Sequence, residues 1–468
     1  MAEPASQEIQ KYSTLVKLQP ENAENHFLLG LAFENAGQVA ESNKCYDQCI
    51  KLQPRHSLAH LHRGFHLARA GDPDRALTEW NRAFDLDPNL STKFATDPHT
   101  QREYKQKIDS SIQNFTKPIL INPKNAFAHY QLGTAYKFFN LLELSLQSLK
   151  RALDINPRLH EAYHQCGEIY SLLDQNKLAI THFKMAVDAN PRYADSHYQL
   201  ATVYERENQS TLAIKHLEEA IKLDADKAAY YFAFGRTLMR QTKYKVAMQQ
   251  IQKGLNLDKN NARGYLLLAE CCKELYRPDL ALVSYERAVE QDPNFKDAIY
   301  ELGTIALQLG EIDKAISSFE RALELKADDP LAHFYLAQAY HRKNQYTEAE
   351  EHYRQASELS PKDAFAAYNL GLVRQELGKH RGALDAFRKA VDLKPQDATY
   401  HLVLAKCAMG QEQNDEAVSH LREAIKLNPN DLETNFLLAD VMMDMGQFDE
   451  AISMFRKVTE ITPDSVDA

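Results

Sequence analysis

Large, small and helix-ending residues recur along this chain at intervals of 34 residues. Eleven of the 17 prolines are separated by 34 residues or a multiple of 34, except for one step of 35 between the third and the fourth: Pro20, Pro54, Pro88, Pro123, Pro157, Pro191, Pro293, Pro361, Pro395, Pro429 and Pro463. With the proline taken as position 32, the repeats start at Ala23, Ser57, Ala126, His160, Ala194, Ala228, Ala262, Lys296, Pro330, Ala364, Ala398 and Leu432. Position 8 then holds only glycine or alanine, position 20 is mostly alanine, and position 24 is large.

Each repeat is predicted to form two helices joined by a tight turn. A small residue at position 8 lets two helix backbones approach, and a large residue at position 24, such as Trp80 or Phe183, fills the space between them. Glycine at position 15, as in Gly37 and Gly310, is expected to end the first helix in a left-handed conformation. Helices of about 14 residues are marginal alone, so the pairs must stack on one another. The sequence therefore predicts an all-α solenoid.

Composition and charge narrow the function. The chain has 468 residues and a net charge of −10, which disfavours a nucleic-acid partner because phosphate binding needs a basic surface. No apolar stretch is long enough for a membrane span, and residues 1–12 contain no apolar signal segment. The six cysteines include no C-x-x-C pair that would indicate a thiolate zinc site or a disulfide framework. We expect a cytoplasmic protein without cofactor or metal and without membrane insertion.

The repeats resemble the tetratricopeptide repeat, TPR. The strings that carry the resemblance are Tyr300-Glu301-Leu302-Gly303 followed by Ala315, Phe319 and Ala322, and Tyr368-Asn369-Leu370-Gly371 followed by Ala383, Phe387, Ala390 and Pro395. The resemblance implies a right-handed superhelix of about twelve to thirteen 34-residue repeats, in which first helices line a concave groove. It also implies a protein that binds other proteins or peptides and is not itself an enzyme.

Departures from the repeat define the expected domain organisation. Residues 1–22 resemble only a second helix and are expected to cap the array, followed by two repeats over 23–90. Residues 91–122 contain two off-register prolines, Pro98 and Pro118, and helix geometry is expected to break somewhere in this segment. This segment is interpreted as a degenerate repeat. Its departure from the pattern is either sequence drift without consequence or a hinge between a short amino-terminal array and a longer carboxyl-terminal one. Ten repeats over 123–463 and a tail at 464–468 complete the chain.

One string resembles a catalytic motif. His160-Glu161-Ala162-Tyr163-His164 has the H-E-x-x-H form, which on a helix places two imidazoles on one face to hold zinc. The repeat register instead puts these residues at the exposed start of a first helix, and no third ligand is apparent from spacing. We therefore predict no catalytic and no metal-binding residues.

Binding residues are sought at the positions that the resemblance assigns to the groove. Successive repeats place a glutamine after a ring at Tyr130-Gln131, His164-Gln165 and Tyr198-Gln199, and Tyr368-Asn369 follows the same pattern. Side-chain amides both donate and accept, so such a ladder could pair with an extended peptide backbone, although ordinary polar surface would look the same. The candidate groove residues are Tyr130, Gln131, Thr134, His164, Gln165, Tyr198, Gln199, Arg206, Arg236, Arg240, Tyr368 and Asn369. The three arginines are expected to converge on an acidic group.

The sequence thus predicts a non-enzymatic scaffold that binds an extended peptide or a protein surface in its groove. Two alternatives stay open. The first is self-assembly through the last repeat, since Ala451, Ile452 and Phe455 keep the apolar pattern of an internal repeat. The second is a regulatory TPR region of a larger, transferase-like protein.

Overall fold

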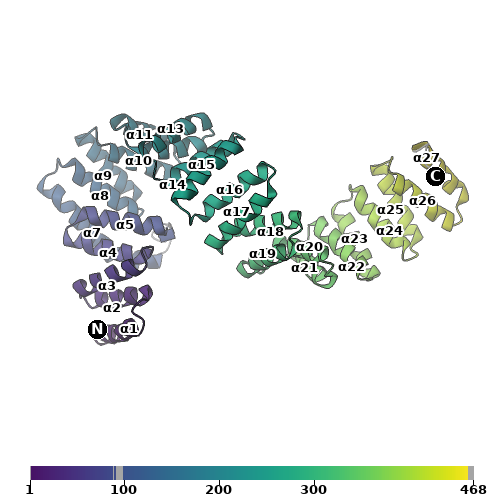
Figure 1. Cartoon of the computed structure of the whole chain (residues 1–468), viewed down its shortest axis with the longest axis horizontal. Helices are drawn as coiled ribbons and strands as arrows, with labels where there is room; N and C mark the ends of the chain where they lie inside the picture. Colours follow the sequence, from purple (N-terminus) through teal and green to yellow (C-terminus); the bar gives the residue numbers. More distant parts are fainter. Residues whose placement is uncertain (1, 88, 91–97, 462–468) are drawn as a thin grey trace. The chain divides into compact units, whose positions relative to one another are not determined.

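The predicted all-α solenoid is confirmed: within each of two compact units, consecutive helices pack in pairs and the pairs stack on one another (Figure 1). The computed structural model describes residues 2–87, 89–90 and 98–461, and the side chains of 7–87, 89–90 and 104–459. No strand occurs among these described residues. The units are residues 1–241 and 242–468. Their boundary lies within one sequence repeat and not in residues 91–122.

The bounds of the helices follow the predicted register. In the first unit they are α1 (Ala2–Leu18), α2 (Ala23–Asn35), α3 (Val39–Leu52), α4 (Ser57–Ala70), α5 (Pro73–Leu86), α7 (Pro98–Ile121), α8 (Ala126–Phe138), α9 (Leu142–Ile155), α10 (His160–Leu172), α11 (Asn176–Ala189), α12 (Ala194–Arg206), α13 (Ser210–Leu223) and α14 (Ala228–Arg240). In the second unit they are α15 (Tyr244–Leu257), α16 (Ala262–Glu274), α17 (Pro278–Gln291), α18 (Lys296–Leu309), α19 (Ile312–Leu325), α20 (Pro330–Arg342), α21 (Tyr346–Leu359), α22 (Ala364–Glu376), α23 (His380–Leu393), α24 (Ala398–Met409), α25 (Asn414–Leu427), α26 (Leu432–Asp444) and α27 (Phe448–Ile461). Every predicted repeat start is the first residue of a helix.

The core lies between the two helices of each pair, where positions 8 and 24 meet. A Cβ added to Gly167 on α10 would lie 2.7 Å from two ring carbons of Phe183 on α11, and Phe183 is fully buried. The same approach recurs between Gly303 and Phe319. Position 8 is therefore small because the ring at position 24 occupies the space that a side chain would need.

The turn between the paired helices uses a left-handed residue at position 15. Five glycines have the predicted positive φ: Gly37, Gly71, Gly310, Gly378 and Gly446. The non-glycine residues with positive φ occupy the same position in the other repeats: Asn140, Asp174, Asn208, Thr242, Tyr276, Asn344 and Glu412. Because this backbone conformation costs a side-chain-bearing residue about 1–2 kcal/mol, the turn geometry outweighs the local preference in these repeats.

A side chain at position 4 links successive repeats. In six repeats a histidine Nε2 lies within hydrogen-bond distance of the backbone carbonyl six residues earlier, at the end of the preceding repeat: His26, His60, His129, His197, His333 and His401. In the last repeat the Asn435 amide donates to the carbonyl of Pro429 at 3.1 Å. A carbonyl only accepts, so each of these histidines carries its proton on Nε2.

Residues 98–121 form one helix that contains both off-register prolines, and the expected break in helix geometry stays a prediction for the rest of the segment. Pro98 is the first residue of α7, where no backbone donor is needed, and Pro118 lies in its last turn. The Phe115 ring of α7 stacks on Trp80 with their centroids 5.9 Å apart. Helix α7 packs on both α4 and α8. Residues 91–97 lie outside the described residues, as does the predicted tail at 464–468, and the predicted domain boundaries stay a prediction.

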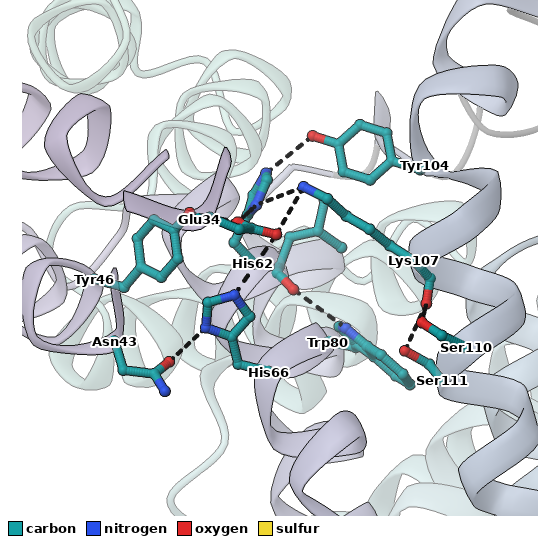
Figure 2. A network of polar contacts seen from close by, with 11 residues as sticks. Glu34, Asn43, Tyr46, His62, His66, Trp80, Tyr104, Lys107, Ser110 and Ser111 are labelled. Carbon is teal, nitrogen blue, oxygen red and sulfur yellow. Dashed lines mark hydrogen bonds and ion pairs between the residues drawn. The ribbon is translucent and has the colours of Figure 1, made fainter. Parts of the chain in front are cut away.

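A buried polar network fixes α7 to the first two repeats. Figure 2 shows Lys107 of α7 reaching Glu34 of α2, and Tyr104 of α7 reaching His62 of α4. The Glu34 carboxylate accepts from Tyr46 Oη at 2.7 Å and from His62 Nδ1 at 2.8 Å, and Lys107 Nζ lies 2.9 Å from its other oxygen. Burial alone would raise the pKa of Glu34, but its histidine and lysine partners hold that pKa far below the usual range. Glu34 is therefore an anion that four helices share.

Candidate functional site

A groove of about 600 Å³ lies in the first unit, between the end of α5 and the start of α14. First helices of successive repeats, α8, α10, α12 and α14, supply most of its wall. The side chains that line it are Leu77, Thr78, Asn81, Asp85, Tyr130, Thr134, Lys137, Phe138, His164, Gln165, Glu168, Tyr193, Asp195, Tyr198, Gln199, Lys227, Ala229 and Tyr230. Six of the predicted groove residues are among them: Tyr130, Thr134, His164, Gln165, Tyr198 and Gln199.

Tyrosine rings form much of the groove wall. The Tyr198 and Tyr230 rings lie 5.0 Å apart, and Tyr193 packs edge-on against His164 at 5.1 Å. Burial raises the pKa of Tyr130, Tyr193 and Tyr230, and nearby carboxylates raise them further. These phenols therefore stay neutral, and each offers an apolar face with a polar tip.

Two ion pairs cross between successive first helices at the groove. Lys137 Nζ of α8 lies 2.6 Å from Glu168 Oε2 of α10, and Lys227 Nζ lies 2.8 Å from Asp195 Oδ1 of α12. Tyr230 also donates to Asp195 Oδ1 at 2.6 Å. Burial alone would raise the pKa of both carboxyl groups, but these partners hold each pKa below its usual range. The wall of the groove is thus held in place before any ligand binds.

The amide ladder is shorter than the sequence predicted. Gln165 and Gln199 line the groove, and the buried Oε1 of Gln165 has no hydrogen-bond partner among the described residues. Gln131 does not line the groove, because its side chain is only 7% exposed and its Nε2 donates to Asp74 Oδ1 of α5 at 2.7 Å. Gln131 therefore holds neighbouring repeats together and is not free to meet a ligand.

The expected cluster of arginines forms in part, but around a carboxylate of the chain itself. Arg236 donates through Nε and Nη2 to the two carboxylate oxygens of Glu205, at 2.9 and 2.8 Å, and Arg240 Nε lies 3.3 Å from Glu205 Oε1. Arg206 instead donates to Ser171 Oγ at 2.8 Å. Since Glu205 is 4% exposed, Arg236 and Arg240 neutralise a buried charge of the fold.

The remaining predicted pair lies in the second unit. Tyr368 stacks on Tyr400 with their centroids 5.1 Å apart, and the Asn369 amide donates to the backbone carbonyl of Phe365 at 2.8 Å. Asn369 is 9% exposed. Both side chains are thus engaged in internal packing.

The H-E-x-x-H string does not assemble a metal site. His160 Nε2 lies 3.0 Å from Asn190 Nδ2, whereas His164 Nδ1 lies 2.9 Å from Ser196 Oγ. The two imidazoles thus meet different partners. No group of three or more potential ligands that could hold a metal ion occurs among the described residues.

Several groove residues were not chosen from the sequence. Lys137, Glu168 and Asp195 stand at positions 12, 9 and 2, all of which the family resemblance assigns to the groove. The register was therefore a sufficient signal for them. Tyr193 lies two residues after Pro191, and Tyr230 stands at position 3 of its repeat. The family resemblance assigns neither position to the groove, so no signal in the sequence indicated these two tyrosines.

The stacked helix pairs and the repeated positions define a protein of the tetratricopeptide-repeat class. Models described as Tetratricopeptide repeat match residues 27–91, 128–159 and 194–227. A model described as Cilia and flagella-associated protein 70 C-terminal domain matches residues 226–467, just over half of the chain. The chain therefore belongs to the family of this TPR domain. No curated protein sequence matches it.

Solved TPR structures are similar to parts of the chain. The TPR protein YrrB, described as having an unusual peptide-binding site, is 25% identical, with a TM-score of 0.37, over 39% of this chain and 95% of its own. MamA from Desulfovibrio magneticus is 24% identical, with a TM-score of 0.35, over 36% and 95%. A TPR protein from Cytophaga hutchinsonii is 16% identical, with a TM-score of 0.45, over 51% and 97%. Among the described residues, no helix combines the length and the apolar character of a membrane span.

Proposed function

We propose that the chain is a non-enzymatic scaffold that binds an extended peptide segment of a partner protein in the groove between α5 and α14. The observation that carries this proposal is the convergence of Gln165, Gln199 and a wall of tyrosines on one groove of about 600 Å³. The Oε1 atom of Gln165 has no hydrogen-bond partner among the described residues, so rotation of this amide toward the groove would offer an acceptor to a peptide N–H without breaking an existing hydrogen bond. TPR-family proteins generally act as protein-interaction scaffolds, which supports the same function.

Recognition would use a wall that is already in place. The amides of Gln165 and Gln199 can each donate to and accept from a peptide backbone, so they fix the path of the chain and not its sequence. Tyrosine faces give large contact areas while ordering few rotatable bonds. The ion pairs of Lys137 with Glu168 and of Lys227 with Asp195 keep the wall from rearranging on binding.

The test is binding by the double variant Gln165→Ala/Gln199→Ala. Partners are first identified by affinity capture, and ciliary and flagellar proteins are examined first because of the family matched by residues 226–467. Calorimetry with one purified partner then compares the wild type with the variant. We expect a loss of at least about tenfold in affinity, since two amide contacts are removed.

Two controls make the result specific. Gln131 is left unchanged because it binds Asp74, and Gln308→Ala alters an exposed amide on α18 of the second unit. Equal helicity of all variants is confirmed by circular dichroism. If the double variant binds the partner as tightly as Gln308→Ala does, the groove is not the binding site.

A second candidate function is self-association through the outer face of α27. Ile452 stands at position 21 and is 51% exposed, whereas Leu282, Ile316 and Leu384 at the same position are at most 8% exposed under the next repeat. Light scattering over a range of concentrations tests this candidate. A larger assembly that Ile452→Glu dissolves would support it, and a monomer at every concentration would exclude it.

A further inference from the structure

Negative charge predominates along the groove. Among its lining side chains the carboxylates of Asp85, Glu168 and Asp195 outnumber the ammonium groups of Lys137 and Lys227. Both lysines are already paired within the wall, at 2.6 and 2.8 Å from their carboxylates. Asp85 has no ion pair among the described residues. Its Oδ2 accepts one long hydrogen bond, of 3.4 Å, from the side-chain amide of Asn81. One carboxylate in the groove is therefore left without a cation.

The surroundings of Asp85 disfavour its charge. Asp85 is exposed to the groove, and partial desolvation of its carboxyl group by the surrounding side chains raises its pKa, as does nearby Glu168, while Arg82 and Lys137 only partly compensate. The pKa shifts of Tyr130 and Tyr193 also indicate a negative electrostatic potential in the groove. Glu161 and Glu168 both raise the pKa of Tyr130 and of Tyr193. A cation placed beside Asp85 and Glu168 would relieve this excess of negative charge.

The neutral groups point to the same ligand. Gln165 Oε1 is a buried acceptor without a donor among the described residues. The Tyr130 and Tyr193 rings line the same groove, and an aromatic face attracts a cation. A guanidinium group offers five donors in a plane, which suits a carboxylate, an amide oxygen and a ring face together better than a compact ammonium does.

We propose that the peptide bound in this groove presents a basic side chain, arginine in preference to lysine, to the part of the groove formed by Asp85, Gln165 and Glu168. This inference rests on the proposed function and adds the chemical class of its ligand. An acidic segment would instead place its carboxylates beside three of the same sign, at a cost in binding free energy.

The first test is selection of binders from a randomised peptide library displayed on phage, with the full-length chain as bait. Sequences are kept only if they bind the wild type and fail to bind Gln165→Ala/Gln199→Ala. We expect arginine to be enriched over the input library at one position, with aspartate and glutamate depleted. Enrichment of acidic residues, or no charge preference at all, would overturn the inference while leaving the groove as a binding site.

The second test measures the affinity of one selected peptide by fluorescence anisotropy. Asp85→Asn is expected to weaken binding of the arginine peptide about tenfold, the effect of losing one charged hydrogen-bonded contact. The same variant should leave binding of the peptide with glutamine in place of arginine unchanged. Glu324→Gln, which alters an exposed carboxylate of the second unit, is the matched control.

The outcomes separate the two proposals. If Asp85→Asn and Glu324→Gln bind the arginine peptide equally well, the charge preference is wrong and the groove proposal stands on Gln165 and Gln199. If no library peptide distinguishes the wild type from Gln165→Ala/Gln199→Ala, the proposed function itself fails, and with it this inference.

Discussion

The Nδ1 atoms of His197 on α12 and His216 on α13 lie 3.0 Å apart. His197 Nε2 is 3.2 Å from the carbonyl oxygen of Pro191, which can only accept, so His197 Nδ1 is the acceptor of the pair. His216 must then donate from Nδ1. Two neutral rings in complementary tautomers therefore join the first and second helices of this repeat.

The same pair occurs twice more, always between positions 4 and 23. His333 with His352 and His401 with His420 have the same 3.0 Å separation of their Nδ1 atoms. In an earlier repeat Glu79 replaces the second histidine, and its Oε2 lies 2.7 Å from His60 Nδ1. In this repeat a carboxylate and not a second imidazole joins the two helices.

We predict that acid weakens the His197–His216 pair. Burial lowers the pKa of His216 to about 4, with contributions from His197, Lys215 and Lys184 that Glu219 only partly opposes. Since the ordinary value is 6.5, the unfolded chain binds a proton between these two values that the folded chain does not. Stability of α12 and α13 should fall as the pH is lowered through this window, by about 1 kcal/mol after allowance for the partial exposure of the ring.

Hydrogen exchange of peptides from α12 and α13, compared at about pH 7.5 and about pH 5, measures this change as a local opening free energy. In His216→Gln the amide can still donate to His197 but does not titrate, so the pH dependence should shrink. His182→Gln, at a half-buried histidine of α11 that is not paired with a second histidine, is the control. An unchanged pH dependence in His216→Gln would contradict the prediction.

The glycine at position 8 should be costly to replace. In Gly167→Ala the new Cβ would lie 2.7 Å from the Phe183 ring, so the paired helices must separate. Overpacking of this kind costs about 1–3 kcal/mol, against a gain in helix propensity of about 1 kcal/mol, so we expect a net destabilisation of up to about 2 kcal/mol. Urea unfolding measures it. Gly410→Ala, where a Cβ would meet nothing closer than 3.6 Å, should be neutral or stabilising, and equal losses in both variants would refute the argument.

The turn residue Tyr276 should be improvable. Its φ is 56° and its side chain is 94% exposed, so it carries backbone strain with almost no packing to offset it. Tyr276→Gly should stabilise the second unit by about 1 kcal/mol, because glycine adopts this conformation without a Cβ clash. Tyr276→Ala keeps the Cβ and should give no such gain. A similar midpoint shift for both variants in urea would show that the side chain, not the backbone, is responsible.

Breaking the Glu34 network should loosen α7. In Glu34→Gln the Lys107 ammonium, whose side chain is 20% exposed, loses its counter-charge, a change that costs about 3 kcal/mol at fully buried pairs and less at a partly buried one. We expect faster hydrogen exchange in α7 and α4. Adding Lys107→Met should recover part of this loss, whereas Glu24→Gln, at a carboxylate 58% exposed, should change little. Unchanged exchange in Glu34→Gln would mean that apolar packing alone holds α7.

The sequence predicts a contact of the fold only when the two residues are close along the chain or recur with the period of the repeat. The pairing of Gly167 with Phe183 lies within one repeat and recurs in others, so periodicity alone predicts it. The contact of Gln131 with Asp74 spans 57 residues, and no local pattern distinguishes a glutamine that faces the groove from one that faces the preceding repeat.

The candidate site was predictable only in part for the same reason. Positions of the repeat identified Gln165 and Gln199 as groove residues, and the structure places both there. Arg236 and Arg240 occupy equally suitable positions, yet Glu205 binds both. Which charges remain available depends on pairings between repeats, and these follow from three-dimensional packing and not from the period.

The histidine at position 4 makes the array modular. Its hydrogen bond reaches the carbonyl six residues earlier and so crosses the seam between two helix pairs, as between His401 and Pro395. Excision of one complete period of 34 residues would bring equivalent donors and acceptors together again at a new seam. Deletion of a single residue would shift every side chain before the seam by about 100° around its helix and leave the carbonyl without a donor. The length of the scaffold can therefore change by whole repeats that carry a histidine or asparagine at position 4, and the seams between such repeats keep the same hydrogen bond.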